Sequence, residues 1–120
     1  MNEKKTLVIG ASENPSRYSN MAIRSLRNHR HPVLALAKRQ GKVDDVNITT
    51  DFPREDIDTV SLYVGPQWQP EYYEKVLQLK PRCVIFNPGT ENPEFKNLLE
   101  ENNIEAVEAC TLVMLSVGNY

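Results

Sequence analysis

Residues 7–20, LVIGASENPSRYSN, place a short apolar run directly before a glycine, a polar loop and the start of a helical pattern. Such a run, ended by small residues, is typical of a buried strand followed by a tight turn. The helical pattern from Asn20 to Asn28 has one apolar face, which includes Ile23 and Leu26. The stretch therefore predicts a strand–loop–helix unit. A phosphate can sit against the helix start in such a unit, although this loop lacks the usual glycine triplet.

Similar apolar segments recur along the chain, at residues 33–37 (VLALA), 59–64 (TVSLYV), 83–86 (CVIF) and, more weakly, 104–107 (IEAV). Continuous rather than alternating apolar runs are typical of strands buried on both faces of a parallel sheet. Helical spacing lies between them, after Pro70 and after the Asn92-Pro93 start signal. The alternation predicts an α/β fold: a three-layer, doubly wound, Rossmann-like parallel sheet.

Residues 41–58 decide the strand order. They hold only a faint strand signal, at 46–49, before an expected turn at Phe52-Pro53. With a short edge strand there, the order is that of the Rossmann fold, 3-2-1-4-5-6; without it, the order is the flavodoxin-like 2-1-3-4-5. In both cases the first strand lies beside the 59–64 strand. A ligand is then expected at the carboxyl ends of these two strands, between residues 10–20 and 64–69.

Composition narrows the class of protein. A chain of 120 residues is expected to form a single domain, residues 1–120. A net charge of -2 with mixed signs argues against a nucleic-acid partner. No apolar run approaches the ~20 residues of a membrane span, and the first residues do not form a secretory signal. We expect a cytoplasmic protein without a membrane partner. The separate cysteines, Cys83 and Cys110, predict buried reduced thiols and no metal site.

The loop after the first strand offers groups that suit an anion. Gly10 and Ala11 have small side chains that let backbone N–H groups approach a phosphate. Hydrogen bonds are expected from Ser12, Asn14 and Ser19, and Arg17 offers a forked cation. The alternative is a simple tight turn with a solvated arginine.

The second strand ends in Ala37, Lys38 and Arg39, where NAD enzymes usually have an acid that grips the ribose. Two cations at this place suit a ribose that carries a phosphate. NADP and coenzyme A both meet that description. Ordinary surface charges are the alternative.

Several segments together resemble the small stand-alone CoA-binding domain proteins of bacteria. These are similar to the CoA-binding Rossmann domain of the succinyl-CoA synthetase α subunit and of ADP-forming acyl-CoA synthetases. The segments are residues 10–20 (GASENPSRYSN), the basic end of the second strand, 51–66 (DFPREDIDTVSLYVGP) and 87–95 (NPGTENPEF). The resemblance covers the chain from about Leu7 to Cys110.

The resemblance implies coenzyme A or an acyl-CoA as the ligand. Its phosphates would meet the first loop, its ribose phosphate the basic pair, and its adenosine or pantetheine arm the end of the 59–64 strand. The implied residues are Gly10, Ala11, Ser12, Asn14, Pro15, Arg17, Ser19, Lys38, Arg39, Val64, Gly65 and Pro66. Two turns depart from the family pattern, LALAKRQG at 34–41 and NPGT at 87–90.

No residue pair indicates catalysis, because Ser12 has no histidine placed to activate it. The phosphohistidine of the larger relatives belongs to a further domain. We therefore expect a binding module without catalytic residues. One alternative is an NADP-dependent or other nucleotide-using enzyme completed by a partner chain. Another is an interaction protein that has lost its ligand. The sequence leaves a protein partner or a homo-oligomer open.

Overall fold

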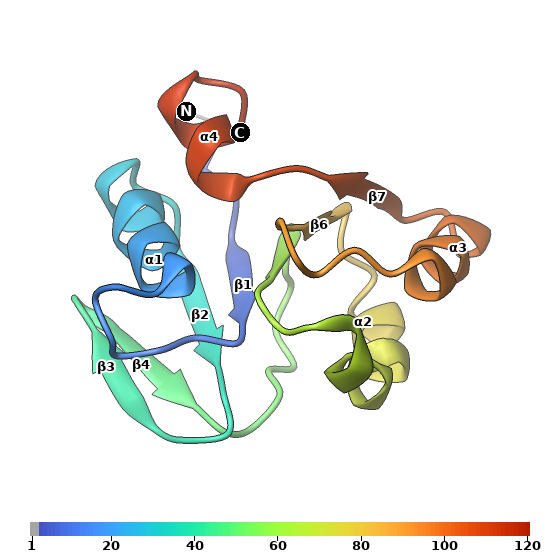
Figure 1. Cartoon of the computed structure of the whole chain (residues 1–120), viewed down its shortest axis with the longest axis horizontal. Coiled ribbons are helices and arrows are strands. Elements are labelled where there is room, and N and C mark those ends of the chain that lie inside the picture. The colour runs from blue at the N-terminus through green and yellow to red at the C-terminus, as the bar shows by residue number, and fades with distance from the viewer. Residues whose placement is uncertain (1–2) are drawn as a thin grey trace.

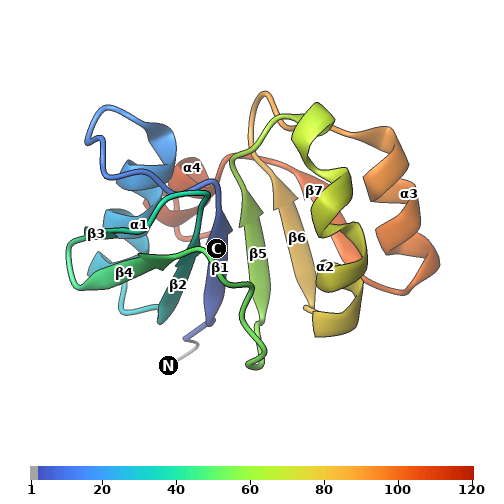
Figure 2. The ribbon, with the colours of Figure 1, turned by 90° about the horizontal axis from the view of Figure 1, so that it is seen from below.

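The computed structural model describes residues 3–120, and these form one seven-stranded sheet in the order β3-β4-β2-β1-β5-β6-β7 (Figures 1 and 2). The strands are β1 (Thr6–Ile9), β2 (Val33–Leu36), β3 (Gly41–Val43), β4 (Val46–Thr49), β5 (Thr59–Leu62), β6 (Cys83–Phe86) and β7 (Glu105–Glu108). Every pairing is parallel except that of β3 with β4.

The parallel strands confirm the Rossmann order. β4, the faint strand of the sequence, lies beside β2, so β4-β2-β1-β5-β6-β7 corresponds to 3-2-1-4-5-6. The expectation that β4 forms the edge is wrong, because β3 pairs outside it. A tight turn joins β3 to β4, and its Asp44 has a φ of 55°. Three residues with one buried side chain, Val43, give no periodic signal for such a strand.

Helices cover both faces of the sheet (Figure 1). α1 (Tyr18–Asn28) and α4 (Thr111–Ser116) lie on one side, and α2 (Tyr73–Leu79) and α3 (Pro93–Glu101) on the other. Successive side chains of β1 point to opposite faces of the sheet. Leu7 belongs to the same core cluster as Val76 and Leu99, whereas Val8 belongs to that of Leu26. Both faces are buried, which explains the continuous apolar run. The three-layer, doubly wound arrangement is confirmed.

Helix starts follow local signals where these exist. The Asn92 side chain accepts a hydrogen bond from the Phe95 N–H at 3.2 Å, so the predicted cap of α3 is confirmed. α1 begins at Tyr18, two residues before the predicted start, and its start has no such side-chain cap. Two short 3-10 helices, η1 (Pro66–Trp68) and η2 (Pro70–Tyr72), precede α2.

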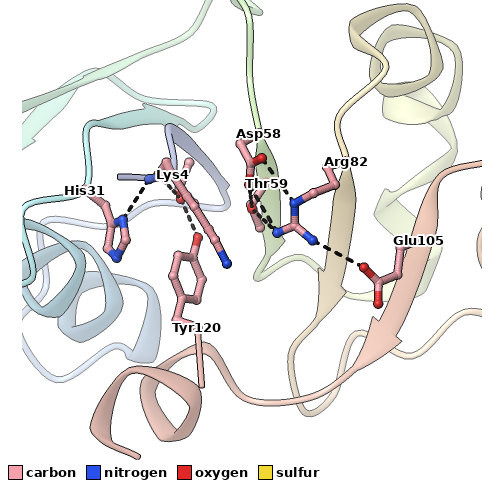
Figure 3. Close-up of polar contacts among 8 residues, drawn as sticks. Lys4, His31, Asp58, Thr59, Arg82, Glu105 and Tyr120 are labelled. Atoms are coloured by element: carbon pink, nitrogen blue, oxygen red, sulfur yellow. Dashed lines mark hydrogen bonds and ion pairs between the residues drawn. The ribbon is translucent and has the colours of Figure 1, made fainter. Parts of the chain in front are cut away.

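Side chains at the amino ends of the strands hold the end of the chain in place (Figure 3). The Tyr120 hydroxyl hydrogen-bonds the Thr6 hydroxyl, and the Tyr120 ring lies edge-on to the His31 ring at a centroid distance of 4.9 Å. Arg82 lies between Asp58 and Glu105 and bonds to both, at 3.2 and 3.3 Å. These contacts join the chain end and the starts of β5, β6 and β7 at the amino edge, around a cavity of about 360 Å³. In an open α/β sheet the ligand is expected at the opposite, carboxyl edge.

The imidazole of His31 makes this edge sensitive to acid. Burial first, and then the positive charges of His29 and Lys4, lower the pKa of His31 below its usual value. Its Nδ1 accepts the Lys4 backbone N–H at 2.9 Å, which requires the neutral ring.

We expect the free energy of unfolding to fall as the pH drops below about 6.5, because the unfolded chain then binds a proton that the folded His31 resists. Urea unfolding between pH 7.5 and 5 measures this. His31→Asn, whose side-chain oxygen can still accept the Lys4 N–H, should flatten the acid slope. His29→Asn should reduce the slope only in part, because it removes one neighbouring charge but keeps both the burial of His31 and its contact with Lys4. An unchanged slope in His31→Asn would show that another group is responsible.

Candidate functional site

A cleft opens at the carboxyl edge of the sheet, where the loops after β1, β5 and β6 meet at the top of Figure 2. Its volume is about 370 Å³. The strand order reverses between β1 and β5, so this is the place where an open α/β sheet binds ligands. The lining residues are Gly10, Ser12, Arg17, Tyr18, Ser19, Tyr63, Gly65, Pro88, Gly89 and Thr90.

The first turn of the loop after β1 is fixed by the ends of its neighbouring strands. The N–H groups of Gly10 and Ala11 both donate to the Leu36 carbonyl, at 2.9 and 3.1 Å. These two amides are therefore used within the fold. Gly10 has a φ of 96°, and a Cβ there would lie 2.9 Å from both the Tyr63 carbonyl oxygen and Val64 Cγ1. Glycine lets the ends of β1 and β5 approach this closely.

The rest of the loop is held by its own polar groups. The Ser12 hydroxyl accepts the Asn14 N–H at 3.1 Å, and Asn14 Oδ1 accepts the Ser16 N–H at 3.0 Å. Glu13 reaches outward, and its carboxylate accepts the Lys42 N–H of β3 at 2.9 Å. The hairpin that sequence reasoning missed thus supports the loop in front of the cleft.

The start of α1 presents free N–H groups to the cleft. The Met21 N–H donates to the Arg17 carbonyl, but the amides of Tyr18, Ser19 and Asn20 have no hydrogen-bond acceptor among residues 3–120. The helix dipole adds partial positive charge there. Arg17 is exposed, lines the cleft and forms no ion pair with any described residue. The arrangement suits a phosphate or diphosphate.

Buried amide side chains fix the opposite wall. The Gln69 side chain is fully buried, and its Nε2 donates to the Val64 carbonyl at 2.9 Å and to the Thr90 carbonyl at 2.8 Å. Its Oε1 accepts from Asn92 at 3.0 Å. The loop after β5, which carries Gly65, is thereby tied to the loop after β6. Sequence reasoning placed Gln69 in the wall at residues 64–69 without its structural role, and missed Thr90, because neither stands in a local pattern.

Asn87, directly after β6, joins three elements. Its Nδ2 donates to the Ser61 hydroxyl at 2.9 Å and to the Leu62 carbonyl at 2.8 Å, while its Oδ1 accepts the Thr111 N–H at 2.8 Å. Asn87 thus links β5 and β6 to the start of α4. The unusual turn at residues 87–90 therefore has a structural role.

The Tyr63 hydroxyl is the one buried side-chain polar atom in residues 3–120 without a hydrogen-bond partner. Burial raises the pKa of Tyr63 to about 12, and the nearby hydroxyls of Thr111 and Ser61 lower it by less. Those two hydroxyls bond each other at 2.8 Å. Tyr63 lines the cleft, but its unpaired hydroxyl lies in the interior near Ser61 and Thr111.

Lys38 lies outside this cleft, beside a second cavity of about 140 Å³. Its Nζ contacts the Glu71 carboxylate oxygens at 2.5 and 2.6 Å and lies 5.7 Å from the centre of the Tyr72 ring. The bonds to Glu71 raise the pKa of Lys38 above its usual value. Arg39 is exposed and forms no ion pair with any residue in 3–120. Sequence reasoning missed Glu71.

The implied ligand residues therefore fall into three groups. Gly10, Ser12, Arg17, Ser19 and Gly65 line the larger cleft, and Lys38 lines the smaller cavity. The remaining implied residues line neither of these two cavities; they are Ala11, Asn14, Pro15, Arg39, Val64 and Pro66.

Residues 3–120 contain no group of three His, Cys, Asp or Glu residues placed to hold a metal ion. Cys83 is buried at the amino edge, and burial raises its pKa to about 11. Cys110 is half-buried, at the start of α4. No described helix has both the length and the apolar character needed to cross a bilayer.

Comparison with known proteins agrees with this geometry. The family model described as "CoA binding domain" matches residues 4–116. No curated protein matches the chain.

A solved structure described only as an uncharacterized protein is 44% identical, with a TM-score of 0.96 and full coverage of both chains. A protein from Thermus thermophilus is 24% identical, with a TM-score of 0.87, over 98% of this chain and 91% of the other. A hypothetical protein from Pyrococcus horikoshii OT3 is 23% identical, also with a TM-score of 0.87, over 96% and 83%. The latter two show a shared fold.

Proposed function

This chain belongs to the CoA-binding domain family, and from that premise we propose that it binds coenzyme A or an acyl-CoA in the cleft at the carboxyl edge of its sheet. The observation that carries the proposal is the open start of α1. Tyr18 and Ser19, whose backbone amides are free, and Arg17, which forms no ion pair in residues 3–120, line one cleft. A diphosphate is the part of coenzyme A that this arrangement suits best.

Each part of the ligand has a counterpart in the protein. The diphosphate oxygens accept from the first-turn N–H groups and from Arg17, with the Ser12 and Ser19 hydroxyls beside them. The pantetheine or adenosine arm follows the β5 loop past Gly65, which the Gln69 amide holds in place. The ribose phosphate lies toward Lys38, which follows the strand whose Leu36 carbonyl binds the first loop.

The proposed role is that of a binding module. Ser12 accepts a backbone N–H of its own loop. His29 follows the last residue of α1 and His31 contacts the amino edge, so neither histidine is placed to activate Ser12. We therefore assign no catalytic step to the cleft residues.

A thermal-shift comparison of coenzyme A, acetyl-CoA, NADP and NAD tests the ligand class. A ligand at about 100 times its Kd should add ~2.7 kcal/mol to the free energy of unfolding. We expect coenzyme A or acetyl-CoA to raise the Tm and NAD to leave it unchanged. A rise with NADP but not with coenzyme A would contradict the proposal.

Arg17→Ala should weaken coenzyme A binding about ten- to a hundredfold, because it removes a charged hydrogen bond to the diphosphate. Isothermal titration calorimetry measures the change. The affinity for dephospho-CoA, which keeps the diphosphate, should fall by the same factor in Arg17→Ala. Arg30→Asn is a matched control, because it removes a cation beyond the far end of α1, at a positive φ that asparagine tolerates. Equal Kd values for wild type and Arg17→Ala would remove Arg17 from the site.

A further inference from the structure

The smaller cavity at the ends of β2 and β4 has an unbalanced set of charges. Its lining includes two lysines, Lys38 and Lys75, one carboxylate, Glu71, and the Thr50 hydroxyl. Phe52 and Tyr72 stack at a ring distance of 6.4 Å. Lys75 Nζ lies 5.9 Å from the Phe52 ring, so both lysines stand over the aromatic pair. These charges sum to one positive charge while Glu71 is present.

Glu71 forms an ion pair with Lys38, the cation that the ribose phosphate of the ligand would contact. Both of its carboxylate oxygens lie within hydrogen-bond distance of Lys38 Nζ, which is how an anionic oxygen of a phosphate would approach. A phosphate monoester carries about -1.5 to -2 charges at neutral pH. Two lysines match that charge only when the Glu71 carboxylate has moved away. Glu71 is half-exposed, so it can rotate into solvent without unfolding its helix.

We infer that Glu71 determines how strongly this protein prefers a ligand whose ribose carries a phosphate monoester, because its carboxylate competes with that phosphate for Lys38. The inference rests on the proposed function, since it concerns the ribose end of the same ligand. Glu71 is thus a specificity-determining residue: its negative charge lowers the affinity for the phosphorylated ligand and leaves that for the unphosphorylated one unchanged.

Coenzyme A and dephospho-CoA differ only in this phosphate, so their Kd values, measured by calorimetry, test the inference. Glu71→Gln should bind coenzyme A about two- to fivefold more tightly, the range that an exposed ion pair supports. Its Kd for dephospho-CoA should equal that of the wild type. Glu74→Gln is the matched control, because it removes the same charge one turn along without touching Lys38. Lys38→Met should abolish the gain when combined with Glu71→Gln.

The outcomes separate the two claims. Equal preference for coenzyme A in Glu71→Gln and wild type would overturn the role of Glu71 while leaving the proposed function intact. Weaker dephospho-CoA binding in Glu71→Gln would also overturn it, because Glu71 would then hold the ribose hydroxyls. If wild type and all variants bind neither compound, the proposed function fails, and the inference fails with it.

Discussion

Asn87→Ala is expected to lower the free energy of unfolding by about 3–5 kcal/mol, because it leaves several buried partners unpaired at ~1–3 kcal/mol each. The lost contacts are those to the Leu62 carbonyl, the Thr111 N–H and the Ser61 hydroxyl. The Ser61 hydroxyl keeps its bond to Thr111, so we do not expect the full sum. Urea unfolding monitored by circular dichroism measures the change.

The same substitution on the surface serves as the control. Asn97 is an exposed asparagine of α3, and Asn97→Ala should change the free energy of unfolding by less than about 0.5 kcal/mol. A loss in Asn87→Ala no larger than this would mean that the interior bonds are replaced by other partners. The β5, β6 and α4 junction would then not depend on this amide.

Gly10→Ala should lower the free energy of unfolding by about 2–4 kcal/mol, because backbone strain and a steric clash add together. The φ of 96° is unfavourable for any residue with a Cβ. The new methyl would also lie 2.9 Å from the Tyr63 carbonyl oxygen, a backbone atom that can move only if β5 moves away. Ligand affinity should fall as well, because the cleft opens between these strands.

Gly89→Ala separates the two contributions. Gly89 has a similar φ of 92°, but a Cβ there would meet no atom within 4 Å. Gly89→Ala should therefore lower the free energy of unfolding only by the backbone strain, about 1–3 kcal/mol. Equal losses in both variants, measured by the same denaturation, would show that the contact between the ends of β1 and β5 contributes nothing.

The parts of the fold that the sequence predicts are those with local causes. β1, β5 and β6 are buried on both faces, so their apolar runs are continuous and easily recognised. The start of α3 follows from Asn92, whose capping bond spans three residues. β3 has no such cause: its pairing with β4 is antiparallel and its turn lacks glycine, so neither period nor turn chemistry indicates it.

The site divides in the same way. The loop from Gly10 to Arg17 is contiguous, so its suitability for an anion follows from residue types in order. The bond between Lys38 and Glu71 joins residues 33 positions apart, and that between Gln69 and Thr90 spans 21. Such pairs exist only because the sheet brings separate loops to one edge. Single-sequence patterns therefore indicate the contiguous loop proposed to bind the diphosphate better than the pairs formed between distant loops.

Tyr120 and Lys4 lie side by side at the amino edge, with the Lys4 amine 5.4 Å from the Tyr120 ring (Figure 3). A tether attached at Tyr120 would therefore emerge at the amino edge, away from the cleft at the carboxyl edge. The molecule can be anchored to a biosensor chip through residue 120 and still present the cleft to the flowing solution.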